Sequence, residues 1–234
     1  MSFGGAEKQV LNILIGLKKM GVSVMLVTLI KPSAFTKQLK QNNIDYNCLG
    51  LTVRNKMNPL LHCKSMAHLY CIVQKFQPNI IHSHLFHSNM YGRIISLFTS
   101  ARNISTVHSL IEDGRFRPPF YRFTDRLCYK TVFVSNASRN LYLQNKASVE
   151  ERSCVINNGL DFNRKNINSK RLNELRLNYA INPNDFVWLA IGRLVQSKDY
   201  PLLIESFSIF HQRNNNAKLL IVGDGKCYDI IKDI

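Results

Sequence analysis

Two cations follow a buried strand in the last third of the chain. The apolar run Phe186–Ile191 predicts the strand, and Arg193 and Lys198 come shortly after it. Arginine offers a planar fork of donors and lysine a mobile point charge, so together they can stabilise a diphosphate leaving group without a metal. Cations on a loop are more often simply solvated, and the residues alone leave that alternative open.

Glycine residues mark two further places where phosphates could approach the backbone. A glycine pair ending at Gly5 opens the predicted helix Ala6–Met20, whose first N–H groups and positive dipole end attract anions. Gly223 and Gly225 belong to a turn directly after the predicted strand Lys218–Val222. Tight turns and helix caps need the same residues, so neither pattern specifies a ligand by itself.

Histidines gather in the middle of the chain. His82, His84 and His87 resemble the HxHxDH pattern of binuclear metal hydrolases, but Phe86 stands where that pattern needs Asp and no second cluster of ligands follows. We therefore expect that these histidines bind no metal ion and that His84 lines a polar cleft. A metal hydrolase is the weaker alternative. His108 directly follows another predicted buried strand, where it can bond to a substrate hydroxyl or serve the fold.

A basic and aromatic stretch covers residues 115–130, in which five Lys or Arg residues stand against one Asp. Five Phe or Tyr residues are interleaved with them. This composition suits the interface of an anionic membrane. A nucleic-acid surface would look similar, but no helix-turn-helix, zinc-finger or RNP pattern accompanies it, so we expect no nucleic-acid partner.

Composition supports a folded chain with an anionic partner. Of 234 residues, 45% are hydrophobic and the net charge is +16, which excludes disorder and a fibre, and no apolar run is long enough to span a membrane. Residues 1–160 hold 20 basic and 7 acidic residues, nearly all of the excess. A solvated basic face is the alternative. Without CxxC spacings or a secretory signal, we expect a cytoplasmic protein, with peripheral contact at the inner face of the membrane.

Predicted helices and buried strands alternate along the chain. Such alternation indicates an α/β protein with parallel sheets. The polar, Asn-rich segment Asn157–Ser169 is the best boundary. We therefore predict two Rossmann-like domains facing a cleft, residues 1–160 and 161–234, with the second incomplete. Predicted helices are Ala6–Met20, Leu60–Phe76, Ser88–Phe98, Tyr121–Tyr129, Ala137–Leu143, Lys170–Tyr179 and Leu202–Gln212, and strands are Val22–Leu29, Asn79–His82, Ile104–Val107, Thr131–Val134, Cys154–Ile156, Phe186–Ile191 and Lys218–Val222.

Taken together, these motifs resemble glycosyltransferase family 4, a group of retaining, nucleotide-sugar-dependent enzymes with the GT-B fold. The similarity extends over almost the whole chain, in blocks of the expected order. The most specific are AIGRLVQSKDYPLLIESF, VINNGLD and LLIVGDG, and the others are GGAEKQVLNILIGLKKMGVSVMLVTL, IIHSHLFHSNMYGRI, STVHSLIEDG and VFVSNASRN.

The resemblance implies roles for the residues already noted. Arg193 and Lys198 would bind the donor diphosphate, with backbone N–H from Gly5, and His108 would be the active-site residue near the reacting carbon of the donor sugar. Two further residues, Gly223 and Gly225, would lie near the nucleotide. The first domain would take the acceptor, a glycan or lipid-linked molecule, in surface polysaccharide or glycolipid synthesis. Transfer would need no metal or other cofactor.

The chain also departs from the family at both ends. No apolar strand precedes the glycine pair, and the paired glutamates that hold the donor ribose and phosphate in the family would lie beyond Ile234. We therefore expect the 234 residues alone to transfer sugar poorly or not at all. The alternative from a different class is a non-catalytic remnant that binds an anionic membrane or partner.

Overall fold

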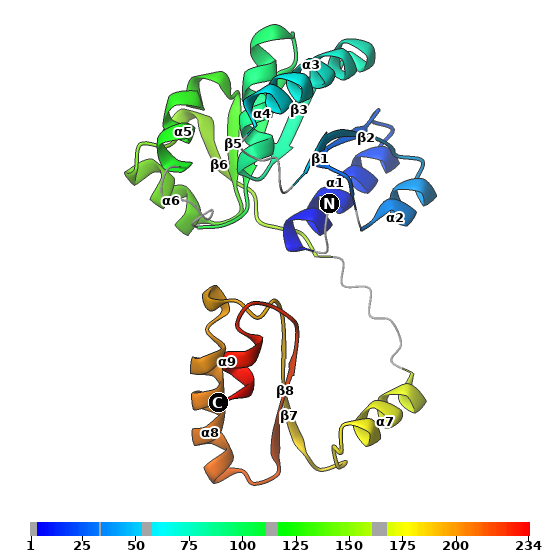
Figure 1. Ribbon diagram of the computed structural model, residues 1–234, viewed down its shortest axis with the longest axis vertical. Helices are drawn as coiled ribbons and strands as arrows, with labels where there is room; N and C mark the ends of the chain where they lie inside the picture. The colour runs from blue at the N-terminus through cyan, green and yellow to red at the C-terminus, as the bar shows by residue number, and fades with distance from the viewer. Residues whose placement is uncertain (1–3, 33, 53–57, 111–116, 161–167) are drawn as a thin grey trace. The chain divides into compact units, whose positions relative to one another are not determined.

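The chain folds into two compact units, Met1–Asp161 and Phe162–Ile234. A computed structural model describes residues 4–32, 34–52, 58–110, 117–160 and 168–234 (Figure 1). Each unit combines helices with parallel strands, so the predicted α/β class is confirmed. No helix in the described ranges is long and apolar enough to cross a membrane.

The first unit contains two parallel sheets. β1 pairs with β2, and β3, β4, β5 and β6 form a four-stranded sheet in that order. Helices alternate with the strands along the chain (Figure 1). The elements are α1 (Gly5–Lys19), β1 (Met25–Ile30), α2 (Thr36–Gln41), β2 (Asp45–Leu51), α3 (Pro59–Phe76), β3 (Ile80–His84), α4 (Phe86–Ile95), the 3₁₀ turn η1 (Ser96–Phe98), β4 (Arg102–Val107), α5 (Arg117–Thr124), η2 (Asp125–Leu127), β5 (Lys130–Phe133), α6 (Asn136–Gln144), η3 (Glu150–Arg152) and β6 (Ser153–Val155).

Two elements of this unit, α2 and β2, were not predicted from the sequence. Helix α2 is only one and a half turns long, and β2 opens with polar, exposed Asp45 and contains Gly50 at a φ of 76°, where the pairing with β1 shifts register. A strand with a polar start and an internal glycine lacks the apolar run that signals burial. Helix α5 also begins earlier than predicted and ends at Thr124, because Pro118 and Pro119 fit its first turn.

Buried apolar side chains tie the helices to the sheets in three clusters. One joins α1 and α2 to β1, another joins α3 and α4 to β2, and the third joins α5 and α6 to β4 and β5. In the third cluster, Tyr121 packs edge-on against Tyr142, and Tyr142 against Phe133, with ring centroids 5.3 and 5.2 Å apart. This cluster fixes α5 against the sheet.

Arg93 of α4 is fully buried beside this cluster. Its Nε donates to Ser105 Oγ at 3.2 Å, Nη1 to Tyr121 O at 3.1 Å and Thr124 Oγ1 at 3.0 Å, and Nη2 to Thr131 Oγ1 at 3.0 Å. The guanidinium also lies 4.9 Å from the centre of the Tyr121 ring. No carboxylate pairs with it among the described residues. Within the described ranges, the buried charge of Arg93 is therefore stabilised by neutral acceptors alone. Its side chain connects α4 to β4, α5 and β5.

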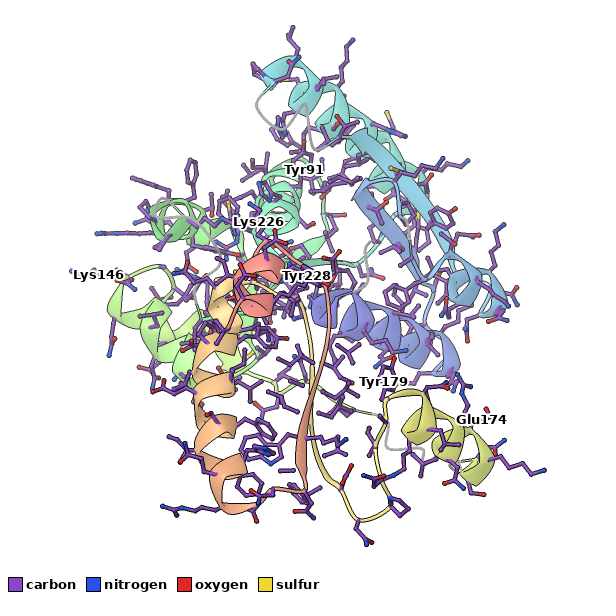
Figure 2. All side chains as sticks on the ribbon, turned by 60° about the horizontal axis from the view of Figure 1, so that its bottom comes forward. Tyr91, Lys146, Glu174, Tyr179, Lys226 and Tyr228 are labelled. Atoms are coloured by element: carbon purple, nitrogen blue, oxygen red, sulfur yellow. The ribbon has the colours of Figure 1, made fainter. Side chains whose placement is uncertain are left out.

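The second unit is built on one parallel strand pair. Trp188 of β7 packs against Phe207 and Phe210 of α8, which cover one face of the pair. On the other face, Leu189 and Ile191 are 56% and 73% exposed. The elements are α7 (Ser169–Asn178), β7 (Phe186–Ile191), η4 (Gln196–Lys198), α8 (Tyr200–Arg213), β8 (Ala217–Val222) and α9 (Tyr228–Lys232). No residue of α7 is buried, and Glu174 on this helix is labelled in Figure 2.

Candidate functional site

The register of β3 against β4 brings together His84 and His108, two of the candidate site residues. His84 pairs with Thr106 across the strands, and His108 follows β4 one residue after its end at Val107. His84 Nδ1 and His108 Nε2 are 3.0 Å apart and share one hydrogen bond. Its direction depends on the tautomers, so one ring donates and the other accepts. The Nδ1 atom of His108 is buried and has no hydrogen-bond partner among the described residues.

His82 extends this pair along β3. Its Nε2 is hydrogen bonded to Thr106 Oγ1 at 2.8 Å, and its ring centre is 4.2 Å from that of His84. Although His82 is exposed on one side, desolvation lowers its pKa to about 4, helped by the charge of His108. Desolvation lowers the pKa of His84 further, and it lowers that of His108 against the opposing charge of Glu7. All three rings are therefore neutral near pH 7.

These lowered pKa values predict acid destabilisation of the first unit. The unfolded chain binds protons at these histidines below about pH 6.5 while the folded unit does not, so stability is complete above that pH and falls towards pH 4. In the double variant His82→Gln/His84→Gln the melting temperature should fall less steeply with decreasing pH than it does in the unchanged protein. Melting curves measured at several pH values test this, and an equal slope in the variant would contradict it.

Two backbone features lie close to the histidines: a strained residue, Leu85, and the first turn of α1. Leu85, between His84 and α4, has φ 68° and ψ 155°, a region that normally only glycine occupies and that costs about 1–3 kcal/mol. The first turn of α1 lies near His108, since the charge of Glu7 raises the pKa of that histidine against the effect of desolvation. Gly5 is exposed there, and a Cβ added to it would meet nothing within 4 Å. The sequence patterns assigned no role to Glu7 or Leu85, although Glu7 stands only two residues after Gly5.

In the second unit, the loops after β7 and β8 are joined backbone to backbone. Gly192 N–H donates to Val222 O at 3.0 Å, and Leu194 N–H donates to Asp224 O at 2.9 Å. Leu194 O then accepts from Cys227 N–H at 3.0 Å. These bonds fix the segment that carries Arg193 at the carboxyl ends of both strands, the usual ligand edge of an open α/β sheet.

Two glycines allow this contact between the loops. A Cβ added to Gly223 would overlap the carbonyl oxygen of Gly192, and one added to Gly225 would overlap that of Leu194. Close approach of two backbones is therefore one reason for glycine at these positions. Their predicted place near a nucleotide stays a prediction.

Gly223→Ala is expected to destabilise the second unit by about 2–3 kcal/mol, because the methyl group must push the Gly192 carbonyl aside. Gly159→Ala, in the first unit, is the control for the same substitution at an open glycine, since a Cβ there meets nothing within 4 Å. Urea unfolding of the two variants measures the difference. Equal stability would show that the loops do not pack as described.

The two predicted donor-binding cations are free on this loop. Arg193 and the last residue of η4, Lys198, are both exposed. In the part of the chain that the structure describes, neither side chain has a hydrogen bond or an ion pair. They are thus available to an anion.

The described residues contain no group of three His, Cys, Asp or Glu side chains that could hold a metal ion. His82 and His84 lie on one face of β3, and one ring nitrogen of each is hydrogen bonded, His82 Nε2 to Thr106 and His84 Nδ1 to His108. Of the basic stretch, Arg115 and Phe116 lie outside the described residues. So does most of the predicted boundary segment, residues 161–167.

Comparison with solved structures identifies the fold. Anabaena Alr3699/HepE in complex with UDP and glucose is similar at a TM-score of 0.75 and 20% identity, over 98% of this chain and 61% of that chain. A glycosyltransferase from Rickettsia africae matches at 0.80 and 20%, over 100% and 61%. The apo form of the lipopolysaccharide outer core galactosyltransferase WaaB matches at 0.65 and 14%, over 99% and 60%. The chain has the GT-B fold and spans about three fifths of these proteins.

Sequence comparison supplies the family. No curated protein matches the chain. Residues 3–164 match the family model described as Glycosyltransferase Family 4, which is more than half of the chain. The chain therefore belongs to glycosyltransferase family 4.

Proposed function

We propose that the chemistry of this protein is the transfer of a hexosyl group, with retention, from a nucleotide sugar to a glycan or lipid-linked acceptor in surface polysaccharide or glycolipid synthesis. By themselves the 234 residues bind the donor but transfer the sugar poorly or not at all. The observation that carries this proposal is the exposed, unpaired Arg193 on a loop fixed at the carboxyl ends of β7 and β8. Because HepE was solved with UDP and with UDP-glucose, UDP-glucose is the first donor to test.

In this proposal the second unit holds the donor. Arg193 and Lys198 bind the diphosphate and stabilise the charge that grows on its oxygen as the bond to the sugar breaks. Gly223 and Gly225 lie near the nucleotide, and Gly5 of the first unit offers its N–H to phosphate. Cations and a helix N-terminus replace the divalent metal that other diphosphate sites use, so the reaction needs none.

His108 contacts the donor sugar near the reacting carbon. Its Nε2 is hydrogen bonded to His84, and its buried Nδ1 has no hydrogen-bond partner among the described residues. One hydrogen-bonding position of the ring is therefore unused within the described part of the chain. His84 is then a positioning residue, because the shared hydrogen bond fixes the ring and tautomer of His108. Since desolvation lowers the pKa of His108, its ring meets the sugar in the neutral form.

The experiment is a nuclear magnetic resonance titration of the isotope-labelled chain with UDP, GDP and ADP in the presence of a chelator. One nucleotide should shift the amide signals of residues 192–198 and 223–225. A protein of net charge +16 also attracts anions weakly over its surface. Shifts spread over residues 102–130, with residues 192–198 unchanged, would contradict the proposed donor site.

The alternative is a protein that binds an anionic membrane or partner without transferring sugar. The excess of basic residues in residues 1–160 favours it. We propose a cytoplasmic protein at the inner face of the membrane in either case. Specific nucleotide binding at residues 192–198 separates the two, since a non-catalytic binder has no need of it.

A further inference from the structure

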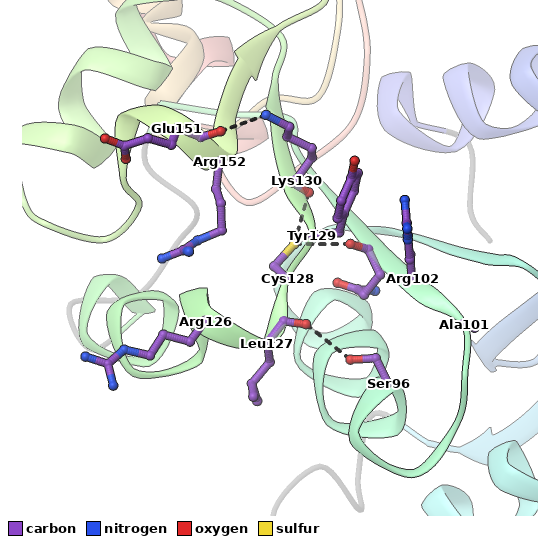
Figure 3. A pocket seen from close by; sticks show the side chains of 11 residues that line it. Ser96, Ala101, Arg102, Arg126, Leu127, Cys128, Tyr129, Lys130, Glu151 and Arg152 are labelled. Atoms are coloured by element: carbon purple, nitrogen blue, oxygen red, sulfur yellow. Dashed lines mark hydrogen bonds between the residues drawn. The ribbon is translucent and has the colours of Figure 1, made fainter.

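A basic pocket opens at the amino ends of β4 and β5 (Figure 3). Its volume is about 570 Å³, and Arg102 and Lys130, the first residues of these two strands, line it. His84 and His108 lie at the opposite edge of the same parallel sheet, where the strands end. The pocket is therefore separate from the site described above.

The charges around the pocket are only partly neutralised. Arg152 is paired with Asp125 at 3.0 Å, and Lys130 Nζ donates to the carbonyl oxygen of Glu151 at 2.7 Å. Arg102, in contrast, stacks over the ring of Tyr129 at 4.8 Å, is exposed, and has no ion pair among the described residues. Arg126 is exposed and has no ion pair within the described ranges. Two guanidinium groups are thus available to an anion.

Exposed apolar side chains stand close in sequence to the residues that line the pocket. Ser96 Oγ donates to Leu127 O at 3.2 Å, which fixes η1 beside η2 at the pocket. Leu97 and Phe98 follow Ser96 and are 59% and 62% exposed. On α5, Tyr121 faces the core and Phe123 faces out, 82% exposed.

We propose that this amino-edge surface, formed by Leu97, Phe98, Arg102, Phe123, Arg126 and Tyr129, docks onto a bilayer that contains anionic lipids. Aromatic rings insert at the headgroup level while arginines bind lipid phosphates, and each cation contributes about 1 kcal/mol near an anionic surface. A free phosphate would explain the pocket but would leave Phe98 and Phe123 exposed. A bilayer accounts for both.

This inference rests on the proposed membrane association and deepens it, because it names the surface that makes the contact. The binding itself needs neither a donor nor sugar transfer. The membrane contact lies away from the carboxyl ends of β3 and β4. Variants of the amino-edge surface should therefore change membrane binding without changing nucleotide binding, and the two proposals can fail separately.

The test is co-sedimentation with vesicles of phosphatidylcholine, alone or mixed with phosphatidylglycerol. The chain should bind the mixed vesicles and be released by high salt. Arg102→Gln/Arg126→Gln should weaken this binding roughly 10- to 30-fold, because two cations are removed. The matched control Lys18→Gln/Lys19→Gln removes two exposed cations of α1 and should change it less than about twofold.

The apolar part is tested separately. Phe98→Ser/Phe123→Ser should weaken vesicle binding roughly tenfold, whereas Leu60→Ser, which changes an exposed leucine of α3, should not. All these side chains are exposed, so unchanged melting temperatures are expected to show that the variants fold. Equal binding to neutral vesicles, an equal loss in the lysine control, or full release by millimolar phosphate at constant ionic strength would overturn the proposal.

Discussion

Arg93→Ala is expected to lower the free energy of unfolding of the first unit by about 3–5 kcal/mol. The substitution leaves Ser105 Oγ, Thr124 Oγ1, Thr131 Oγ1 and a carbonyl oxygen without their common donor and opens a cavity where the side chain was. Because Arg93 joins α4 to β4, α5 and β5, the loss should appear as lowered stability of the whole unit. Urea unfolding followed by circular dichroism measures it.

The control for this prediction is Arg122→Ala on α5, which removes the same charge from an exposed position. It should change the stability by less than about 0.5 kcal/mol. A loss in Arg93→Ala no larger than in the control would mean that the guanidinium is not buried among these acceptors. A total loss of folded protein would agree with the upper end of the expected range.

The second large effect concerns the donor. Arg193→Ala is expected to weaken the binding of a nucleoside diphosphate about 10- to 100-fold, since a charge-assisted hydrogen bond contributes about 1.5–3 kcal/mol. The variant should keep its stability, because the Arg193 side chain is exposed and the loop is held by backbone bonds. Calorimetric titration measures the affinity.

Arg213→Ala supplies the comparison for this prediction, because Arg213 is an exposed arginine at the end of α8 in the same unit. If Arg193 contributed only general electrostatic attraction, the two variants would lose the same affinity for the nucleoside diphosphate. Only a role specific to Arg193 predicts a difference between them. Equal affinities in the two variants would therefore refute the assignment of Arg193.

Much of the architecture could be predicted because buried parallel strands leave continuous apolar runs. The run Phe186–Ile191 is a strand with the predicted bounds, and both units have the expected α/β pattern. β2 was missed because burial of Leu49 and Leu51 is visible only once β1 lies beside them. Its polar first half carries no strand signal.

The histidine pair could be predicted only in part. Each histidine was placed at the end of a strand, but their contact depends on β3 lying next to β4 in a fixed register, which no local pattern specifies. The guanidinium of Arg93 was missed for a similar reason, since its acceptors come from three later elements. Gly223 and Gly225 were noted for a ligand, and their contact with the neighbouring loop appears only in three dimensions.

The most direct test of a metal-independent nucleotide-sugar donor site is the affinity of the chain for UDP, UMP and uridine, and for the guanosine and adenosine series, with a chelator present. One diphosphate should bind at least about tenfold more tightly than its monophosphate, with the same affinity before and after metal removal. Binding that requires a divalent metal, or that does not distinguish diphosphate from nucleoside, would contradict the account.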